Sequence, residues 1–246
     1  MSIFPWPSLY RTSRFKGGPP APDQPFFAIG DVHGRLDLLD PLLDKLLRQP
    51  DPIILVGDYI DRGDDSAGVV KRLHDLRNNK QVICLRGNHE EMLLKFIDKP
   101  RKNGRIWLRH GGLQTLASFG IGGVTAASGP DALMQAHSAL YEILGDQIAW
   151  LAGLPYLWQS GNMAVTHAGA DPLSALDAQS HRAMAWGHPA FLKTARTDGN
   201  WMIYGHKIMP EVTIHEGKVA IDTGAYLTDR LSAIHVTAGA IMPVKA

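Results

Sequence analysis

The chain has 246 residues with 25 basic and 24 acidic side chains, so its net charge is +1 and bulk electrostatics gives no reason to expect a nucleic-acid partner. Its one cysteine, Cys84, excludes a disulfide framework and a thiolate metal site. No apolar stretch approaches the roughly 20 residues that span a bilayer, and the N-terminus lacks a secretory apolar segment. We therefore expect a soluble cytoplasmic protein without membrane insertion.

Residues 1–25 differ in composition from the rest of the chain. They hold six prolines, and three basic residues precede the first acid, Asp23. We predict a Pro-rich basic N-terminal tail followed by a single domain over residues 26–246. Two interpretations of the tail stay open: a partly disordered lead-in that covers a surface groove, or a docking segment that uses its four aromatic side chains.

Three short apolar runs, each followed by glycine and polar side chains, dominate the next part of the chain. Phe26–Ile29 leads into Gly30-Asp31-Val32-His33-Gly34, Ile53–Val56 into Gly57-Asp58-Tyr59-Ile60-Asp61-Arg62-Gly63, and Gln81–Leu85 into Arg86-Gly87-Asn88-His89-Glu90. Apolar residues at helical spacing separate the runs, which predicts a βαβαβ unit with a parallel sheet. One Asp or Asn after a strand is usually a turn residue or helix cap, but three such blocks in succession indicate a ligand site.

A helical cap insertion is expected over about residues 100–154, where apolar residues recur at spacings of three and four and no strand pattern occurs. We predict that its longest helix covers Asp131 to Trp150. The buried stripe of this helix is expected to hold Leu133, Leu140, Ile143, Leu144 and Ile148.

From Tyr156 onward the pattern predicts short strands and a second sheet that packs on the first. The expected strands are Met163–Thr166, Trp201–Tyr204, Val212–Ile214, Val219–Ile221 and Ser232–Val236. Two of them end beside a histidine and a glycine, at His167-Ala168-Gly169 and Gly205-His206. These two histidines repeat the arrangement of the three earlier blocks and become candidate ligands.

Taken in order, the five blocks resemble the metallophosphoesterases of the calcineurin-like phosphoesterase superfamily, specifically the bacterial phosphoprotein-phosphatase-type (serine/threonine) enzymes. The resemblance covers residues 26–236 and extends to Trp107–Gly112, Leu116–Gly120 and Ile221–Ala225. It implies a four-layered α/β/β/α sandwich of two mixed β-sheets flanked by helices.

The resemblance also implies a site for two divalent metal ions. Asp31 and His33 would bind one ion, Asn88, His167 and His206 the other, and Asp58 both. Carboxylate, amide oxygen and imidazole suit Mn²⁺, with Fe or Zn²⁺ as alternatives. Two such ions can share a hydroxide that attacks phosphorus in line.

Four further residues receive catalytic roles from the resemblance. His89 is the expected general acid, and Asp61 holds its tautomer. Arg62 is expected to bind the substrate phosphate, assisted by Arg86. The family usually has a second phosphate-binding arginine where this chain has His188. We predict either that His188 is a weaker, pH-dependent substitute or that Arg182 or Arg196 reaches the phosphate instead.

The expected function is that of a metal-dependent phosphoester hydrolase, foremost a serine/threonine protein phosphatase acting on phosphoproteins or small phosphoesters. The alternative is a dinucleoside polyphosphate hydrolase of the diadenosine tetraphosphate type. A second alternative is a non-catalytic metal-binding adaptor that uses the Pro-rich tail.

Overall fold

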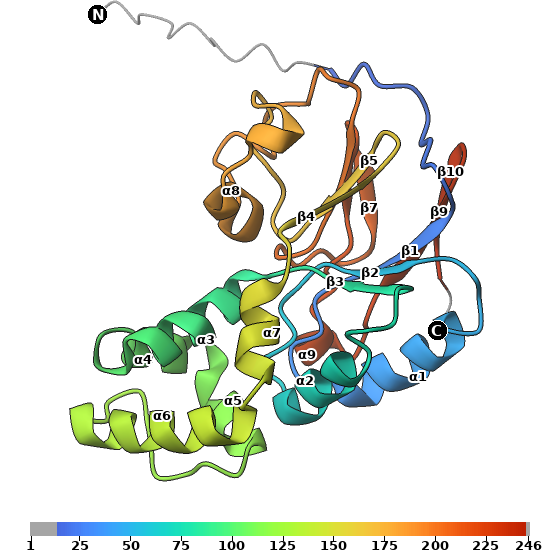
Figure 1. The fold of residues 1–246 in the computed structure, drawn as a ribbon. Coiled ribbons are helices and arrows are strands. Elements are labelled where there is room, and N and C mark those ends of the chain that lie inside the picture. Colours follow the sequence, from blue (N-terminus) through green and yellow to red (C-terminus); the bar gives the residue numbers. More distant parts are fainter. Residues whose placement is uncertain (1–13, 245–246) are drawn as a thin grey trace, which may run out of the picture.

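Two five-stranded β-sheets stack face to face in the computed structural model, which describes residues 14–244 (Figure 1). The first sheet has the order β10-β9-β1-β2-β3. Its strands are β1 (Phe26–Ile29), β2 (Ile53–Leu55), β3 (Val82–Cys84), β9 (Ala233–Thr237) and β10 (Ala240–Pro243). The central strands β1, β2 and β3 run parallel, with Phe27 opposite Ile53 and Ile53 opposite Val82. β9 is antiparallel to β1 and β10.

The second sheet is also mixed and has the order β4-β5-β6-β8-β7. Its strands are β4 (Leu157–Ser160), β5 (Met163–Thr166), β6 (Trp201–Tyr204), β7 (Thr213–His215) and β8 (Lys218–Ala220). β5, β6 and β8 run parallel. The predicted pair of mixed sheets is confirmed, whereas β4 and β10 were not predicted because each is a short edge strand with weak β-propensity.

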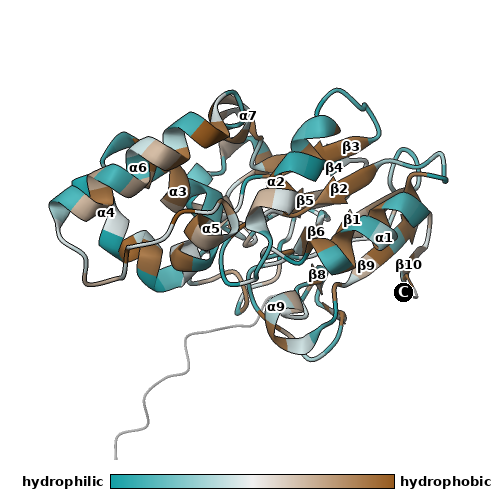
Figure 2. Cartoon of the chain, turned by 90° about the horizontal axis from the view of Figure 1, so that it is seen from below, coloured by the Kyte–Doolittle hydropathy of each residue, from teal (hydrophilic) through white to brown (hydrophobic). Residues whose placement is uncertain are grey.

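Helices cover the outer face of the first sheet, as the βαβαβ prediction requires. α1 (Leu36–Leu46) and α2 (Ser66–Asp75) follow the first two strands, and both lie below the sheet in Figure 1. Each buries one apolar stripe, including Leu39 and Leu73, and turns charged residues outward. Figure 2 shows the same separation, with apolar strands in the middle and hydrophilic helix faces outside.

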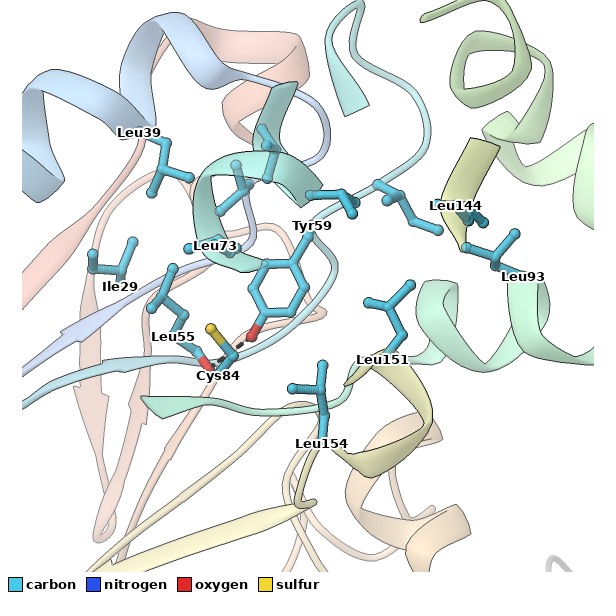
Figure 3. Packing of buried hydrophobic residues seen from close by; sticks show 14 of the residues in the cluster. Ile29, Leu39, Leu55, Tyr59, Leu73, Cys84, Leu93, Leu144, Leu151 and Leu154 are labelled. Atoms are coloured by element: carbon cyan, nitrogen blue, oxygen red, sulfur yellow. Dashed lines mark hydrogen bonds between the residues drawn. The ribbon is translucent and has the colours of Figure 1, made fainter. Parts of the chain in front are cut away.

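A helical insertion follows β3 and shares the core with α1 and α2. It comprises α3 (Asn88–Asp98), α4 (Pro100–Trp107), a π-helical turn (Leu108–Gly112), α5 (Leu113–Ser118), α6 (Pro130–Leu144) and α7 (Gln147–Gly153). Figure 3 shows Leu151 and Leu154 from the insertion next to Tyr59, with Leu144 farther along the same cluster beside Leu93. The hydroxyl of Tyr59 donates to the carbonyl of Leu85 at 2.7 Å. Tyr59, which directly follows Asp58, is therefore held in place by the hydrophobic core.

The prediction of one helix from Asp131 to Trp150 is wrong. The helix ends at Leu144 because Gly145 adopts a φ of +51°, which is outside the helical region, and α7 starts two residues later. Ile143, placed on the buried stripe by the prediction, is 50 % exposed. The pattern of spacings in this stretch fits two short helices as well as one long helix.

The segment that includes α8 (His181–Trp186) covers the outer face of the second sheet. Leu176 before this helix and Phe191 after it belong to a small hydrophobic cluster against the sheet. A short helix, α9 (Ala225–Thr228), lies beyond the end of β8. In residues 14–244, no helix combines the length and the apolar character that a membrane crossing requires.

Residues 14–25 lie against the second sheet and the β9–β10 turn. The ring of Phe15 meets Trp201 edge-on at 5.1 Å, and the amide of Ala21 donates to Asn162 at 2.7 Å. The carbonyl of Pro20 accepts from Gly239 at 2.7 Å. The first 13 residues lie outside the described part of the chain, so the choice between a lead-in and a docking segment stays open.

Candidate active site

Polar side chains gather where parallel strands of both sheets end. Asp31 and His33 follow β1, Asp58 follows β2, Asn88 and His89 follow β3, His167 follows β5, and His206 follows β6. The carboxyl ends of parallel strands meet at one edge, and the two stacked sheets bring their edges together. Residues that are up to 175 positions apart in sequence therefore touch one another, as in the hydrogen bond between Asp31 and the amide of His206.

Asp58 lies at the centre of this group. Its Oδ2 atom is 3.3 Å from His167 Nε2, 3.5 Å from His33 Nε2 and 3.8 Å from His89 Nε2. Burial disfavours the Asp58 carboxylate, but His167 and His89 outweigh it and hold the pKa of Asp58 well below its usual value. The carboxylate is therefore charged and faces three imidazoles.

The donor atoms form two overlapping groups that share Asp58. The first contains His33, Asp58 and His89, and the second contains Asp58, His167 and His206, with the donor atoms of each group within 4.8 Å of one another. Burial lowers the pKa of His33 to about 3 and that of His206 to about 4, so both imidazoles are neutral. At His167, Asp58 and Asp31 outweigh burial and raise the pKa to about 9, so a metal ion bound there would displace a proton. This donor set fits two divalent ions with a shared carboxylate.

Asn88 and Asp31 complete the group from two sides. The Oδ1 atom of Asn88 is 2.9 Å from both His167 Nε2 and His206 Nδ1, so this amide oxygen points into the second group. Asp31 lies at the side, where its two oxygens accept from the amide of His206 at 3.1 and 3.0 Å. The structure thus brings all six predicted ligands together.

The backbone at this site is strained. Among residues 14–244, seven non-glycine residues have a positive φ, and five of them belong to the site. They are His33 (46°), Asp58 (53°), Asp61 (71°), Arg62 (72°) and His206 (64°). Each such conformation costs on the order of 1 to 3 kcal/mol and persists only where surrounding contacts impose it. Concentration of this strain at one place is typical of a functional site.

Two glycines leave room for the carboxylates. A Cβ atom on Gly87 would collide with the side chain of Asp58, and one on Gly205 would collide with Asp31. The glycines of the sequence blocks therefore allow close approach of backbone to ligand, as their position after strands suggested.

Glu90 organises the loop that carries Asp58, a role that the sequence analysis did not assign. Its buried carboxylate accepts the amides of Asp58 at 2.9 Å, Tyr59 at 2.8 Å and Gly87 at 2.9 Å. Burial, together with the charge of Asp58, raises the pKa of Glu90 to about 7. The signal was available, because a Glu three residues after the start of a helix is typical of a capping box.

His89, a member of the first donor group, forms a buried pair with Asp61. His89 Nδ1 is 2.6 Å from Asp61 Oδ2. Asp61 also accepts the indole N–H of Trp107 at 3.0 Å and the hydroxyl of Thr115 at 2.6 Å. Burial alone would lower the pKa of His89, but Asp58 and Asp61 outweigh it and raise this pKa above its usual value. His89 therefore keeps its proton more readily than a free imidazole.

Arg62 extends from the same loop across the site. Its Nη2 lies 3.2 Å from His89 Nε2, and its Nη1 donates to the hydroxyl of Tyr226 at 3.2 Å. The guanidinium carbon lies 4.9 Å from the centre of the Tyr226 ring. Tyr226 is not among the predicted site residues, although it directly follows the motif Ile221–Ala225.

Two predicted residues are not brought to the donor groups. Arg86 donates to the hydroxyl of Tyr156 at 2.9 Å and to the carbonyl of Ala152, so its two terminal nitrogens point to the helical insertion. His188 faces Asp171, with 3.9 Å between Nδ1 and Oδ1. The contacts of Arg86 give no support to its catalytic role. His188 Nδ1 also accepts from the amide of Ala190 at 3.3 Å, and phosphate binding by His188 stays a prediction.

Known proteins are similar to this chain over most of its length. Residues 24–210 match the family model of the calcineurin-like phosphoesterases. The serine/threonine-protein phosphatase 2 of Escherichia coli (strain K12) is 26 % identical over 84 % of this chain and 90 % of its own length. The asymmetrical bis(5'-nucleosyl)-tetraphosphatase PrpE of Oceanobacillus iheyensis is also 26 % identical, over 83 % of this chain and 86 % of its own length.

Solved structures share the fold at low identity. A crystal structure of a protein proposed to be a diadenosine tetraphosphatase has a TM-score of 0.62 and 20 % identity, and the match covers 94 % of this chain and 98 % of the other. A cold-active protein-tyrosine phosphatase from a Shewanella species has a TM-score of 0.57 and 16 % identity, covering 92 % and 83 % of the two chains. The two sheets and their helical layers are thus a known arrangement.

Proposed function

Because the chain belongs to the calcineurin-like phosphoesterase family, we propose that this phosphoester hydrolase is a serine/threonine protein phosphatase. The observation that carries the proposal is the buried His89–Asp61 pair next to Arg62 and the donor groups. Phosphoserine and phosphothreonine are alkyl phosphate esters, and their side-chain oxygen leaves as a strongly basic alkoxide. Their hydrolysis therefore gains most from a positioned proton donor.

Two divalent ions, foremost Mn²⁺, are the proposed cofactors. Asp31 and His33 would hold one, Asn88, His167 and His206 the other, and Asp58 would contact both. When bound, such ions lower the pKa of the attacking water and neutralise charge on the phosphoryl oxygens. Both donor groups contain Asp58, which supports its role as the shared ligand, and they place His33 on one side and His167 and His206 on the other. Asp31 is assigned to the first ion because the family motif places it there.

His89 and Arg62 act on the ester itself. Asp61 accepts a hydrogen bond from Nδ1–H of His89, so the protonated imidazole turns its Nε2–H toward Asp58 and can give that proton to the leaving oxygen. Arg62 stays charged at every accessible pH and offers a planar fork for two phosphoryl oxygens. The cytoplasm is the proposed location, since the single cysteine fits a reducing compartment.

The alternative substrate class is supported by a relative with the same degree of similarity. The tetraphosphatase of Oceanobacillus iheyensis and the phosphatase of Escherichia coli are both 26 % identical to this chain. We place dinucleoside polyphosphates second, because their leaving group is a phosphate of low pKa that needs little help from His89. A non-catalytic adaptor would not need the His89–Asp61 pair, because metal binding alone requires no proton donor.

A comparison of two substrates tests the proposal. With Mn²⁺ present, we expect kcat/KM for a phosphoserine peptide to exceed that for diadenosine tetraphosphate by about tenfold or more, the factor that corresponds to 1.4 kcal/mol of transition-state stabilisation. The variant His89→Asn serves as a control for contaminating phosphatases, because it should lose the peptide activity. A ratio in favour of diadenosine tetraphosphate would make the alternative the function.

A substitution at His188 tests the predicted phosphate contact. Since Asp171 already faces His188, an arginine introduced there should pair with this carboxylate. We therefore expect His188→Arg to change KM for p-nitrophenyl phosphate by about twofold or less, as for other partly exposed ion pairs. A KM that falls strongly, and falls further as the pH rises from 6 to 8, would instead restore His188 as the phosphate ligand that the sequence predicted.

A further inference from the structure

Tyr226 restrains Arg62 from two directions. Its hydroxyl accepts from Nη1 of Arg62 at 3.2 Å, and its ring lies beneath the guanidinium at 4.9 Å. The edge of the same ring meets His33 at 5.3 Å. An arginine side chain has several rotatable bonds, and its grip on a phosphate costs less when contacts already fix the planar fork.

The helix that carries Tyr226 is too short to be stable by itself. α9 has four residues and lies between Gly224 and Asp229, which both adopt left-handed backbone conformations with φ of 70° and 57°. Isolated helices of this length do not persist in water, so the position of α9 depends on contacts with the rest of the chain.

Arg35 supplies such contacts at both ends of α9. Its Nη1 donates to the carbonyl of Ala225 at 2.8 Å and to Asp229 Oδ1 at 2.6 Å. The other edge of the same guanidinium, Nε and Nη2, pairs with Asp37 at 2.8 and 2.7 Å. Arg35 follows His33 by two residues, so one loop carries both a proposed metal ligand and the anchor of α9.

We propose that Arg35 and Tyr226 are positioning residues for Arg62: Arg35 fixes α9, and α9 holds Tyr226 against the guanidinium that binds the substrate phosphate. The proposal rests on the phosphate-binding role of Arg62 in the proposed function. Arg35, Asp37, Arg62, Tyr226 and Asp229 all line one cavity of about 830 Å³. Since water reaches these groups, the Arg35 ion pairs are partly screened, and each should contribute less than the direct contact between Tyr226 and Arg62.

Two carboxylates on the same guanidinium provide a matched pair of variants. Asp229→Asn weakens the contact of Arg35 with α9, whereas Asp37→Asn weakens only the contact on the other edge. Both side chains are largely exposed, at 84 % and 62 %, so neither variant should impair folding. Tyr226→Phe keeps the ring and removes only the hydroxyl.

The assay uses p-nitrophenyl phosphate with Mn²⁺, because this ester reports on phosphate binding whether the natural substrate is a phosphoprotein or a dinucleotide. We expect Tyr226→Phe to raise KM by about tenfold with kcat nearly unchanged, since a bond to a charged group is lost in ground state and transition state alike. Asp229→Asn should raise KM about two- to fivefold and Asp37→Asn should not change it, in line with exposed ion pairs.

Coupling and binding measurements separate positioning from a purely structural role. In an Arg62→Lys background, Tyr226→Phe should have no further effect, because its target is absent. Calorimetry with inorganic phosphate on the Mn²⁺-loaded protein should show weaker binding for Tyr226→Phe, without any turnover. Additive losses in the double variant, unchanged phosphate affinity, or equal effects of Asp229→Asn and Asp37→Asn would overturn the proposal. A higher kcat/KM for diadenosine tetraphosphate than for the phosphoserine peptide would overturn the proposed function but not the positioning role of Arg35 and Tyr226.

Discussion

Asp58→Asn is expected to abolish activity and to release both metal ions. The substitution keeps the size of the side chain but removes the charge at the point where both donor groups overlap. Loss of a residue that merely supports a ligand costs up to about 100-fold in metal affinity or activity, so loss of the shared carboxylate should cost at least that much. Metal analysis after dialysis, together with turnover of p-nitrophenyl phosphate, measures both effects.

His206→Asn is the matched control for this experiment. His206 belongs to the second donor group alone, and it is exposed, so its replacement should affect one ion and leave the other in place. The expected order is therefore two ions for the wild type, one for His206→Asn and none for Asp58→Asn. Two ions and normal turnover in Asp58→Asn would show that Asp58 does not bridge the metals.

The second large effect concerns the leaving group. His89→Asn should slow the hydrolysis of an alkyl phosphate by about 100-fold or more, because general acid catalysis contributes roughly 10² to 10⁴ when the leaving oxygen is strongly basic. The same variant should hydrolyse p-nitrophenyl phosphate at a rate much closer to wild type, since p-nitrophenolate leaves without a proton. Single-turnover rates on both esters give the comparison.

Asp61→Asn and metal content are the controls for the His89 experiment. Asp61 accepts a hydrogen bond from Nδ1–H of His89. Asp61→Asn should therefore also slow the alkyl phosphate more than p-nitrophenyl phosphate, but by a smaller factor. Because His89 Nε2 also lies 3.8 Å from Asp58, metal analysis must show two ions in His89→Asn before the rates are interpreted. Equal losses on both esters, or a missing ion, would remove His89 from the role of general acid.

The sequence alone determined the elements that carry the donor atoms. Each strand and the glycine-containing turn after it are specified by residues that are close in sequence, so the five blocks could be predicted. The choice of Asp31, His33, Asp58, Asn88, His167 and His206 within these blocks came from the resemblance to the metallophosphoesterases. Parallel strands then place their carboxyl ends at one edge for any sequence with this order of elements. The six residues are therefore found together in the structure, and the βαβαβ unit is found as predicted.

Only the tertiary structure decided what surrounds these donor atoms. Asp61 contacts Trp107 and Thr115, which follow it by 46 and 54 residues, and Arg62 contacts Tyr226, which follows it by 164. Arg86 and His188 look suited to phosphate binding in sequence, but Arg86 donates to Tyr156 and Ala152, and His188 Nδ1 accepts from the amide of Ala190. The direction of a long side chain depends on partners that the fold brings from distant parts of the chain, and local sequence patterns contain no information about those partners.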